Sequence, residues 1–254
     1  MKPLSTLAQS VRASTTMAID TQFKKMRAEG IDVIGFSVGE PDFPTPERIK
    51  QAGIRAIEAD QTKYTPTPGT LAVRQAVCQR LAEDWGLHYT TDEVVVTGGG
   101  KPVLYTALKA LVNPGDEVIL PAPYWVSYYE LIQMVGGTPV VVETTEENGF
   151  NLTPQQLRQA ITPKTKALIL NSPSNPTGMI YSRQHLEDLA QVCLEADLYV
   201  IADEMYSKLI FDGKEFVSFP TLSEAVKAHT ILVNGASKTY AMTGWRIGWL
   251  AAPK

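Results

Sequence analysis

Short apolar runs alternate with amphipathic stretches over most of this chain of 254 residues. From residue 94 onward the runs are rich in β-branched side chains, which is typical of strands buried on both faces. Helical spacing of apolar positions separates most of these runs. The alternation predicts an α/β fold with a mostly parallel, doubly wound, seven-stranded sheet and helices on both faces. The predicted strands are 94–97, 117–120, 138–143, 167–171, 198–202, 230–234 and 246–251, and the helices between them are 101–112, 124–135, 154–161 and 183–196.

The first part of the chain follows a different pattern and predicts an arm that precedes the sheet. A helix over 18–29, a short strand over 33–37 and a proline-rich loop over 39–46 make up this arm. A helix then begins near Pro46, which suits a first helical turn, and another helix covers 71–85. At the other end, the last two predicted strands lack a helix-sized connection on every side, so one of them could run antiparallel.

Composition argues against several classes of function. The formal net charge is −4, so the chain has no general basic field and nucleic acid is not favoured as a partner. No apolar stretch is long enough to span a membrane, and the N-terminus lacks the features of a signal peptide. The two cysteines, Cys78 and Cys193, lie far apart in amphipathic stretches, which predicts buried thiols rather than a zinc site. We therefore expect a cytoplasmic protein without a metal centre or a membrane partner.

Polar groups gather after several of the predicted strands. In doubly wound sheets, ligands bind beyond the carboxyl ends of the strands. Three segments lie there, and together they carry an amide, a carboxylate, a phenol, an amine and a guanidinium. That set suits a phosphorylated pyridine aldehyde that is used as an electron sink. The segments are Asn-Ser-Pro-Ser-Asn-Pro-Thr-Gly (171–178), Val-Ile-Ala-Asp-Glu-Met-Tyr (200–206) and Ser-Lys-Thr-Tyr-Ala-Met-Thr-Gly-Trp-Arg-Ile-Gly (237–248).

A glycine turn joins the strand and the helix within residues 94–105. Glycine lets the backbone approach an anion closely, and a helix N-terminus directs free N–H groups at it, so Gly98, Gly99 and Gly100 predict a phosphate cradle. A tight turn without a ligand explains the same residues equally well. The pattern matches neither the Gly-x-Gly-x-x-Gly fingerprint nor the Walker motif, so dinucleotide and nucleoside triphosphate binding are less favoured.

Three charged residues carry most of the predicted chemistry. Asp203 ends a buried strand and needs a partner, which a protonated pyridine nitrogen would provide; the alternative is an N-capping aspartate. Lys238 follows another buried strand, where a desolvated amine has a lowered pKa and forms Schiff bases; the alternative is an exposed loop lysine. Arg246 suits bidentate pairing with a phosphate, and its neighbours predict a tight, buried environment rather than a surface ion pair.

The remaining candidates are weaker one by one. Asn175 sits in a proline-rich turn, where Asn is common for backbone reasons, and Tyr124 and Tyr206 could equally be core aromatics. They support the predicted site because they fall at the same sheet edge as the charged residues.

With these residues the chain resembles the class I and II aminotransferases, which are pyridoxal-phosphate enzymes of fold type I. It is most similar to the bacterial aspartate aminotransferases, some of which also accept prephenate, and the resemblance covers the whole chain. The motifs that carry it are Gly-Glu-Pro-Asp-Phe (39–43), Lys-Tyr-Thr-Pro-x-x-Gly (63–69), Pro-Tyr-Trp-Val-Ser-Tyr (123–128), Asn-x-Pro-x-Asn-Pro-Thr-Gly (171–178), Ala-Asp-Glu-x-Tyr (202–206) and Ser-Lys-Thr-Tyr-Ala-Met-Thr-Gly-Trp-Arg (237–246).

The resemblance implies that pyridoxal 5′-phosphate is the cofactor. Lys238 would join the cofactor covalently and move the substrate proton, and Asp203 would pair with the pyridinium. Tyr64 would reach the phosphate of the neighbouring subunit, which implies a homodimer with shared sites. The other cofactor contacts implied are Tyr206 and Asn175 to the ring phenolate, Tyr124 on the ring face, and Gly99, Gly100, Lys101 and Arg246 near the phosphate.

The substrates implied are an amino acid and a 2-oxo acid, with L-aspartate and 2-oxoglutarate first and prephenate or glutamate next. The residues that would bind substrate are Gly39, Trp125, Asn175, Lys101, Ser14, Thr16 and Arg12, with Lys101, Ser14 and Thr16 matching the device for a distal carboxylate. A C–S lyase or a broad-specificity aminotransferase of the same fold is an alternative. A fragment that binds cofactor without turnover is another.

The chain departs from the family in two places. Many relatives have serine three residues before the lysine, where this chain has Gly235, so a phosphate hydroxyl is missing unless Ser237 replaces it. The family also continues for well over a hundred residues, which form most of a small domain and supply the arginine for the substrate α-carboxylate. We therefore expect a C-terminally truncated chain, with an arm and part of the small domain over 1–45 and an incomplete cofactor domain over 46–254. The Ala122–Pro123 and Asn175–Pro176 bonds are candidates for the cis form.

Overall fold

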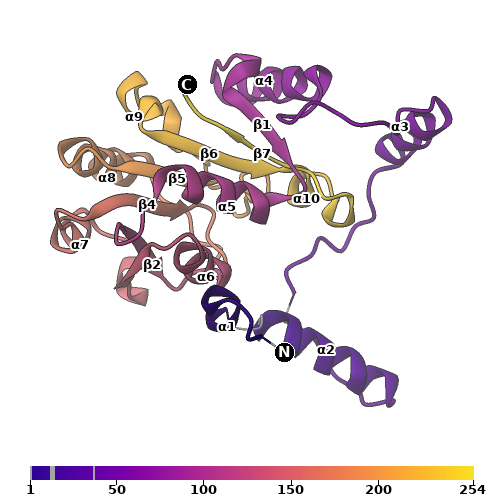
Figure 1. The fold of residues 1–254 in the computed structure, drawn as a ribbon, viewed down its shortest axis with the longest axis horizontal. Coiled ribbons are helices and arrows are strands. Elements are labelled where there is room, and N and C mark those ends of the chain that lie inside the picture. The colour runs from indigo at the N-terminus through magenta and orange to yellow at the C-terminus, as the bar shows by residue number, and fades with distance from the viewer. Residues whose placement is uncertain (1, 12–14, 37) are drawn as a thin grey trace.

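A single seven-stranded sheet forms the centre of the computed structural model, which describes residues 2–11, 15–36 and 38–254 (Figure 1). The strand order is β1-β7-β6-β5-β4-β2-β3. Strands β2 to β6 are parallel, whereas β7 runs antiparallel to both of its neighbours, β1 and β6. The predicted fold class is confirmed, and β7 is the antiparallel strand. The strands are β1 Val94–Thr97, β2 Glu117–Ala122, β3 Thr138–Glu143, β4 Thr165–Asn171, β5 Tyr199–Asp203, β6 Thr230–Gly235 and β7 Gly248–Ala251.

Helices cover both faces of this sheet because alternate strand residues point to opposite sides. On one face, Ile169 and Val233 pack with α5 (Gly100–Leu111) and α6 (Ser127–Met134). On the other face, the residues one position earlier, Leu168 and Leu232, face different helices. Those helices are α4 (Leu71–Trp85), α7 (Pro154–Ala160), α8 (Arg183–Glu195) and α9 (Glu224–Ala228). Burial on both sides explains why the central strands are apolar throughout.

Several helices begin at the signals that the sequence carries. Thr153 caps α7 in a capping box with Gln156, and Pro154 occupies the first turn. Ser182 caps α8 by accepting the His185 N–H, and Gly86 ends α4 in the left-handed conformation. These caps satisfy free backbone groups, so the helix boundaries follow from local chemistry.

The register of the sheet aligns the strand ends that carry the predicted site. Asp203 pairs with Asn171 of β4 and with Val233 of β6. Gly248, the first residue of β7, pairs with both Gly235 and Thr97. The segments that follow β1, β4, β5 and β6, and the segment that precedes β7, therefore meet at one edge of the sheet.

The N-terminal part lies outside this layered body. It contains α1 (Thr6–Ser10), α2 (Thr15–Ala28) and α3 (Glu47–Glu58), and Figure 1 shows α2 and α3 projecting from the sheet. The predicted strand over 33–37 is wrong, because the described residues 33–36 have no regular structure. Ile34 and Phe36 are exposed, and no neighbouring strand offers them hydrogen-bond partners in the described ranges. An apolar run without a paired strand does not form sheet.

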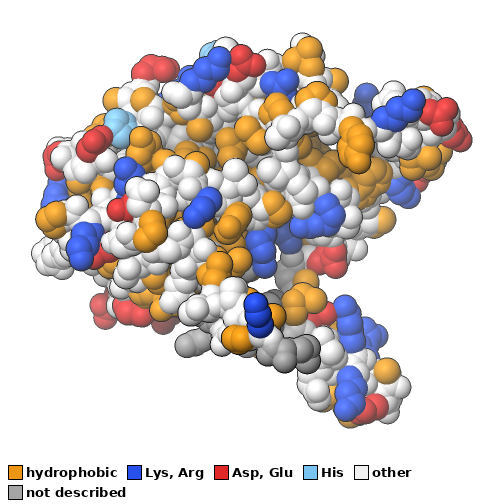
Figure 2. Space-filling model, viewed as in Figure 1, with side chains coloured by type: hydrophobic (Ala, Val, Ile, Leu, Met, Phe, Trp, Pro, Cys, Tyr) orange, Lys and Arg blue, Asp and Glu red, His pale blue; other side chains and the backbone are white. Residues whose placement is uncertain are grey.

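Exposed apolar side chains mark the region between α3 and the body (Figure 2). They include Ile54 and Ile57 on α3 and Trp245 on the segment before β7. None of the helices within the described ranges is both long and apolar enough to cross a bilayer. The remaining short elements are α10 (Ala236–Thr239) and the 3₁₀ turns η1 (Thr91–Glu93), η2 (Glu146–Asn148), η3 (Phe219–Thr221) and η4 (Thr243–Trp245).

Candidate active site

A buried carboxylate lies at the end of β5. Asp203 is 4% exposed, and no Lys, Arg or His side chain in the described ranges forms an ion pair with it. The Tyr128 hydroxyl donates to its Oδ2 at 2.7 Å, and the Met205 N–H donates to its Oδ1 at 3.1 Å. Burial raises the pKa of the Asp203 carboxyl, and these two bonds partly oppose that effect. The hydrogen bond from the Met205 N–H is the kind that an N-capping aspartate accepts, so this alternative role is present. The buried carboxylate nevertheless suits a cationic ligand.

Two residues that support this carboxylate were not predicted from the sequence. Tyr128 of α6 is fully buried, and its pKa is raised by burial and by the neighbouring Asp203. Asn171 donates from Nδ2 to the Asp203 carbonyl at 2.9 Å, and its Oδ1 accepts the Asn175 N–H at 2.7 Å. Tyr128 lies in the motif 123–128 and Asn171 in the motif 171–178, so the sequence indicated both segments. It did not indicate which atoms these two side chains bond to. Together they fix the ends of β4 and β5 relative to α6.

Asn175, Tyr206 and Lys238 converge beside Asp203. The Asn175 Nδ2 donates to the Tyr206 hydroxyl at 3.4 Å. The Lys238 Nζ lies 5.8 Å from the centroid of the Tyr206 ring. Burial raises the pKa of Tyr206, the Asp203 charge adds to that shift, and the Asn175 bond opposes it. An amide, a phenol and an amine thus surround one position at the sheet edge.

Lys238 itself is half-buried on α10 rather than free in solvent. Its Nζ donates to the carbonyl of Gly39, which comes from the proline-rich loop of the arm. Burial lowers the pKa of the Lys238 amine, and the Glu40 carboxylate acts in the opposite direction. An amine with a lowered pKa is a better nucleophile near neutral pH.

The glycine turn before α5 packs against Arg246. Gly99 has a φ of 110°, and a Cβ there would overlap the Arg246 guanidinium. Arg246 also adopts the left-handed region, with a φ of 58°, and its Nη1 donates to the Thr243 carbonyl at 2.8 Å. The prediction that Arg246 is buried is wrong, because residues 244–246 are exposed, Arg246 directly follows the turn η4, and β7 begins only at Gly248.

A second cation completes this end of the site. Burial lowers the pKa of Lys101, and the nearby Arg246 charge adds to that effect. The Lys101 Nζ lies 5.1 Å from the Trp125 ring centroid. Neither Lys101 nor Arg246 forms an ion pair with an acid in the part of the chain that the structure describes. Two cations beside a helix N-terminus form a suitable site for a phosphate or a carboxylate.

Replacing Gly99 with alanine is expected to weaken phosphate binding at least tenfold, because the new methyl group must displace Arg246 and also strain a left-handed backbone. Equilibrium titration with pyridoxal 5′-phosphate, the ligand that the sequence predicts, measures the effect. The matched control is Gly98→Ala, since a Cβ at Gly98 meets no atom within 4 Å and its φ is not left-handed. Equal affinities of Gly99→Ala and Gly98→Ala for pyridoxal 5′-phosphate would contradict a phosphate site at Gly99.

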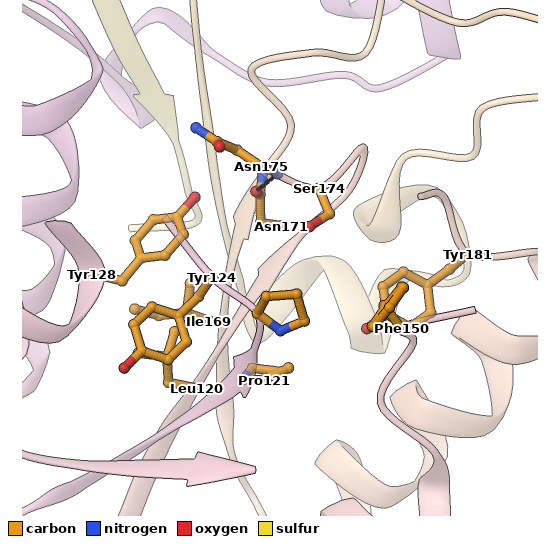
Figure 3. Close-up of a pocket in the computed structure, with 11 residues that line it drawn as sticks. Leu120, Pro121, Tyr124, Tyr128, Phe150, Ile169, Asn171, Ser174, Asn175 and Tyr181 are labelled. Carbon is orange, nitrogen blue, oxygen red and sulfur yellow. Dashed lines mark hydrogen bonds between the residues drawn. The ribbon is translucent and has the colours of Figure 1, made fainter. Parts of the chain in front are cut away.

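A small pocket lies beyond the ends of β2 and β4. Figure 3 shows Tyr124 and Tyr128 on one side of it, Phe150 and Tyr181 on the opposite side, and the Asn171, Ser174 and Asn175 side chains along its rim. The Tyr124 ring is stacked on Tyr129, with centroids 6.4 Å apart and planes 9° apart. Burial is the main cause that raises the pKa of Tyr124.

Other predicted site residues lie elsewhere or outside the described ranges. Tyr64 is fully exposed on the loop between α3 and α4, and its hydroxyl has no hydrogen bond with a described residue. Arg12 and Ser14 lie outside the described residues. Thr16 is the second residue of α2, and its side chain is not described.

Position 235, where many relatives have serine and this chain has glycine, leaves little room for a side chain. A Cβ at this position would lie 2.8 Å from the Ile247 carbonyl oxygen, because β6 and β7 approach closely where Gly235 pairs with Gly248. Ser237 is buried nearby on α10. The Ala122–Pro123 and Asn175–Pro176 bonds are cis, as predicted, and the Ser172–Pro173 bond is also cis.

Comparison with known proteins connects this geometry to a family. The family model "Aminotransferase class I and II" matches residues 31–254. An aspartate aminotransferase of Bacillus sp. (strain YM-2) is 49% identical over 248 residues, which is 98% of this chain and 63% of that protein. The aspartate/prephenate aminotransferase of Thermus thermophilus is 43% identical over 254 residues, all of this chain and 65% of that protein.

A solved structure agrees with the sequence matches. The aspartate aminotransferase from Thermus thermophilus with maleate superposes with a TM-score of 0.95 at 43% identity, and covers 100% of this chain and 65% of that chain. This chain therefore spans less than two thirds of the length of the relatives that it matches.

Proposed function

Since this chain belongs to the class I and II aminotransferases, we propose that it acts in the pyridoxal-phosphate-dependent transamination of L-aspartate with 2-oxoglutarate. Prephenate and glutamate are further substrates in this proposal. The observation that carries it is the buried carboxylate of Asp203, which has no basic partner among the described residues, at the same sheet edge as the half-buried amine of Lys238.

The residues fit pyridoxal 5′-phosphate by charge and by space. Asp203 would hold the pyridine nitrogen, since no basic side chain in the described part of the chain pairs with its buried carboxylate. Arg246 and the N–H groups of Gly99 and Gly100 would hold the phosphate, since only glycine leaves room for the guanidinium at position 99. Tyr206 and Asn175 would bond the ring oxygen, and Tyr124 would lie against the ring.

Lys238 has two tasks in the proposed reaction. The bound cofactor supplies an electron sink for the bonds at the α-carbon of the amino acid. Lys238 would hold the cofactor covalently through its Nζ and, when its amine is free, would carry the proton away from the α-carbon of the amino acid. Its lowered pKa keeps a free amine available for the proton. The carboxylate of Asp203 would stabilise positive charge at the ring nitrogen, and Tyr128 and Asn171 keep Asp203 in place.

The substrate side supports a dicarboxylic amino acid. Lys101, a cation without an acidic partner among the described side chains, lies against Trp125 and would attract the distal carboxylate. Gly39 lies within reach of Lys238 and would line the same side. Arg12, Ser14 and Thr16 would extend this surface. The relatives named for aspartate and prephenate support an acidic substrate over the cysteine conjugates of a C–S lyase.

The assembly and the division of the chain are part of the same proposal. A cytoplasmic homodimer would bring the exposed Tyr64 to the phosphate of the partner subunit. Residues 1–45 would form an arm and part of a small domain, and residues 46–254 would form the cofactor domain.

An absorbance titration tests the proposed function. Pyridoxal 5′-phosphate added to the purified chain should give a bound visible band, and aspartate should convert that band to the near-ultraviolet band of the cofactor's amine form, with stoichiometric release of oxaloacetate. A cysteine conjugate and phenylalanine serve as the competing substrates. Bound cofactor that does not respond to aspartate would contradict transamination, and pyruvate released from the conjugate would favour the lyase.

A further inference from the structure

The proline-rich segment Gly39–Thr45 lies across residues 238–246, which run from α10 through the turn η4 and are called the Lys238 loop below. The two segments are about 200 residues apart in sequence, yet four side-chain hydrogen bonds join them. Lys238 Nζ donates to the Gly39 carbonyl, and the Thr243 hydroxyl donates to Glu40 Oε1. The Thr45 hydroxyl donates to the Ala241 carbonyl at 2.6 Å, and the Trp245 indole donates to Thr45 Oγ1 at 3.1 Å.

Two of these bonds place a carboxylate close to the amine. Gly39 accepts from Lys238, and the next residue, Glu40, accepts from Thr243, which lies five positions after Lys238 on the same loop. Because the Gly39 carbonyl and the Glu40 carboxylate are both hydrogen-bonded to the segment 238–243, the Glu40 charge stays near the Lys238 Nζ. Asp42 lies on the same segment, but its carboxylate has no hydrogen bond to the described residues of the Lys238 loop.

Other charged and titratable groups approach from the remaining sides. Tyr206, which follows β5, presents its ring 5.8 Å from the Lys238 Nζ. Arg246 lies on the same loop but packs toward Gly99 and bonds to Thr243. Lys24 of α2 lies within electrostatic range of Glu40, although its direct partner is Asp20 at 2.7 Å. Within the described ranges, Glu40 is the acid whose charge acts on the Lys238 amine.

We propose that Glu40 is a positioning residue for Lys238, holding the amine at the Gly39 carbonyl and stabilising its positive charge. The role in catalysis rests on the proposed function, in which Lys238 carries a proton. Loss of the Glu40 charge alone, with the segment still in place, would let the Lys238 amine lose its proton more readily.

The test follows the protonation of Lys238 in the cofactor-free protein. Acetic anhydride modifies only unprotonated amines, so the yield of modified Lys238 against pH, read by peptide mass spectrometry, gives its titration midpoint. Glu40→Gln removes the charge but keeps the oxygen that accepts from Thr243. We expect this substitution to lower the midpoint by about half a pH unit or more, as for opposite charges several ångströms apart near a protein surface.

Two variants and one internal reference sharpen the result. Asp42→Asn makes the same change in charge two residues away and should leave the midpoint of Lys238 unchanged. Thr243→Val removes the hydrogen bond to Glu40 but keeps the Glu40 charge. The Lys238 midpoint should therefore fall by less in Thr243→Val than in Glu40→Gln. Lys109, exposed on α5, serves as the internal reference for the extent of acetylation in every variant. An unchanged midpoint in Glu40→Gln, or an equal shift in Asp42→Asn, would overturn the proposal.

The same samples separate this inference from the proposed function. Wild-type chain incubated with pyridoxal 5′-phosphate and reduced with borohydride should carry the label on Lys238. Absence of that label is a failure of the proposed function alone, because the acetylation profile is measured without cofactor. A labelled wild type together with an unshifted Glu40→Gln profile is a failure of the positioning role alone.

Discussion

Replacing Lys238 with alanine will abolish the borohydride-stable attachment of pyridoxal 5′-phosphate to this chain. The amine of Lys238 is the one that lies beside Tyr206 and follows the strand paired with the Asp203 strand. Intact-mass measurement after reduction should therefore show one cofactor added to the wild type and background addition to the variant. Any amino-group transfer should fall by roughly 10²- to 10⁴-fold or more, the usual contribution of a lost general acid–base group.

The control for this experiment is the other lysine of the site. Lys101→Ala removes a cation that lies against Trp125 but leaves the amine of Lys238 in place. This variant should keep the covalent label while binding both cofactor and aspartate more weakly. The proposed role of Lys238 is untenable if Lys238→Ala is labelled as fully as the wild type, because the attached amine would then belong to another residue.

The layered part of this fold could be predicted from the chain because each element is signalled locally. The seven apolar runs became β1 to β7, and the missing helical connection near the end of the chain correctly indicated an antiparallel strand. The run at 33–37 has the same local character as these strands but forms none over its described residues. Sheet formation depends on a partner strand, which a local pattern does not contain.

The site was predictable to the level of which segments meet, but not to the level of which atoms bond. Parallel strand ends share an edge, so Asn175, Asp203 and Lys238 could be placed together. The bond from Tyr128 to Asp203 joins residues 75 positions apart and depends on the exact packing of α6. Arg246 is exposed because it follows the turn η4 and precedes β7. The sequence instead predicted a strand that begins at residue 246.

Two adjacent acids at the end of β5 also show that the sequence does not predict which atoms bond. Asp203 and Glu204 are consecutive, and both are buried. Asp203 bonds to Tyr128 of α6, whereas Glu204 accepts the Ser218 hydroxyl at 2.7 Å and the Phe219 N–H at 2.8 Å. The motif alone does not say which of the two faces the proposed cofactor. The hydrogen bonds place Asp203 against α6, as the proposed cofactor role requires, and Glu204 against the segment around η3.

Glu204 should make this protein less stable as the pH rises. Burial raises the pKa of Glu204 from 4.5 to about 8, the nearby Asp203 charge adds to the shift, and the bonds from Ser218 and Phe219 oppose it. Below pH 4.5 the carboxyl is protonated in both the folded and the unfolded chain, so its full stability is present. Between pH 4.5 and about 8 only the unfolded chain loses the proton, and the free energy of unfolding falls.

Replacing Glu204 with glutamine should remove this dependence on pH. The amide keeps an oxygen for the Phe219 N–H and a donor for the Ser218 hydroxyl, and it carries no charge at any pH. One pKa unit corresponds to about 1.4 kcal/mol, so the variant should be more stable than the wild type at pH 8 by an amount on the order of 5 kcal/mol at most. At pH 5 the two should differ little. Urea unfolding followed by circular dichroism at both pH values measures the difference.

A matched substitution on the surface tests whether burial causes this effect. Glu58→Gln makes the same chemical change at the exposed end of α3, and its stability profile should follow that of the wild type. If Glu204→Gln also keeps the wild-type slope between pH 5 and pH 8, then Glu204 is ionised in the folded protein throughout this range. The two hydrogen bonds would in that case outweigh the cost of burial, and the segment around η3 would be held by a charged acceptor.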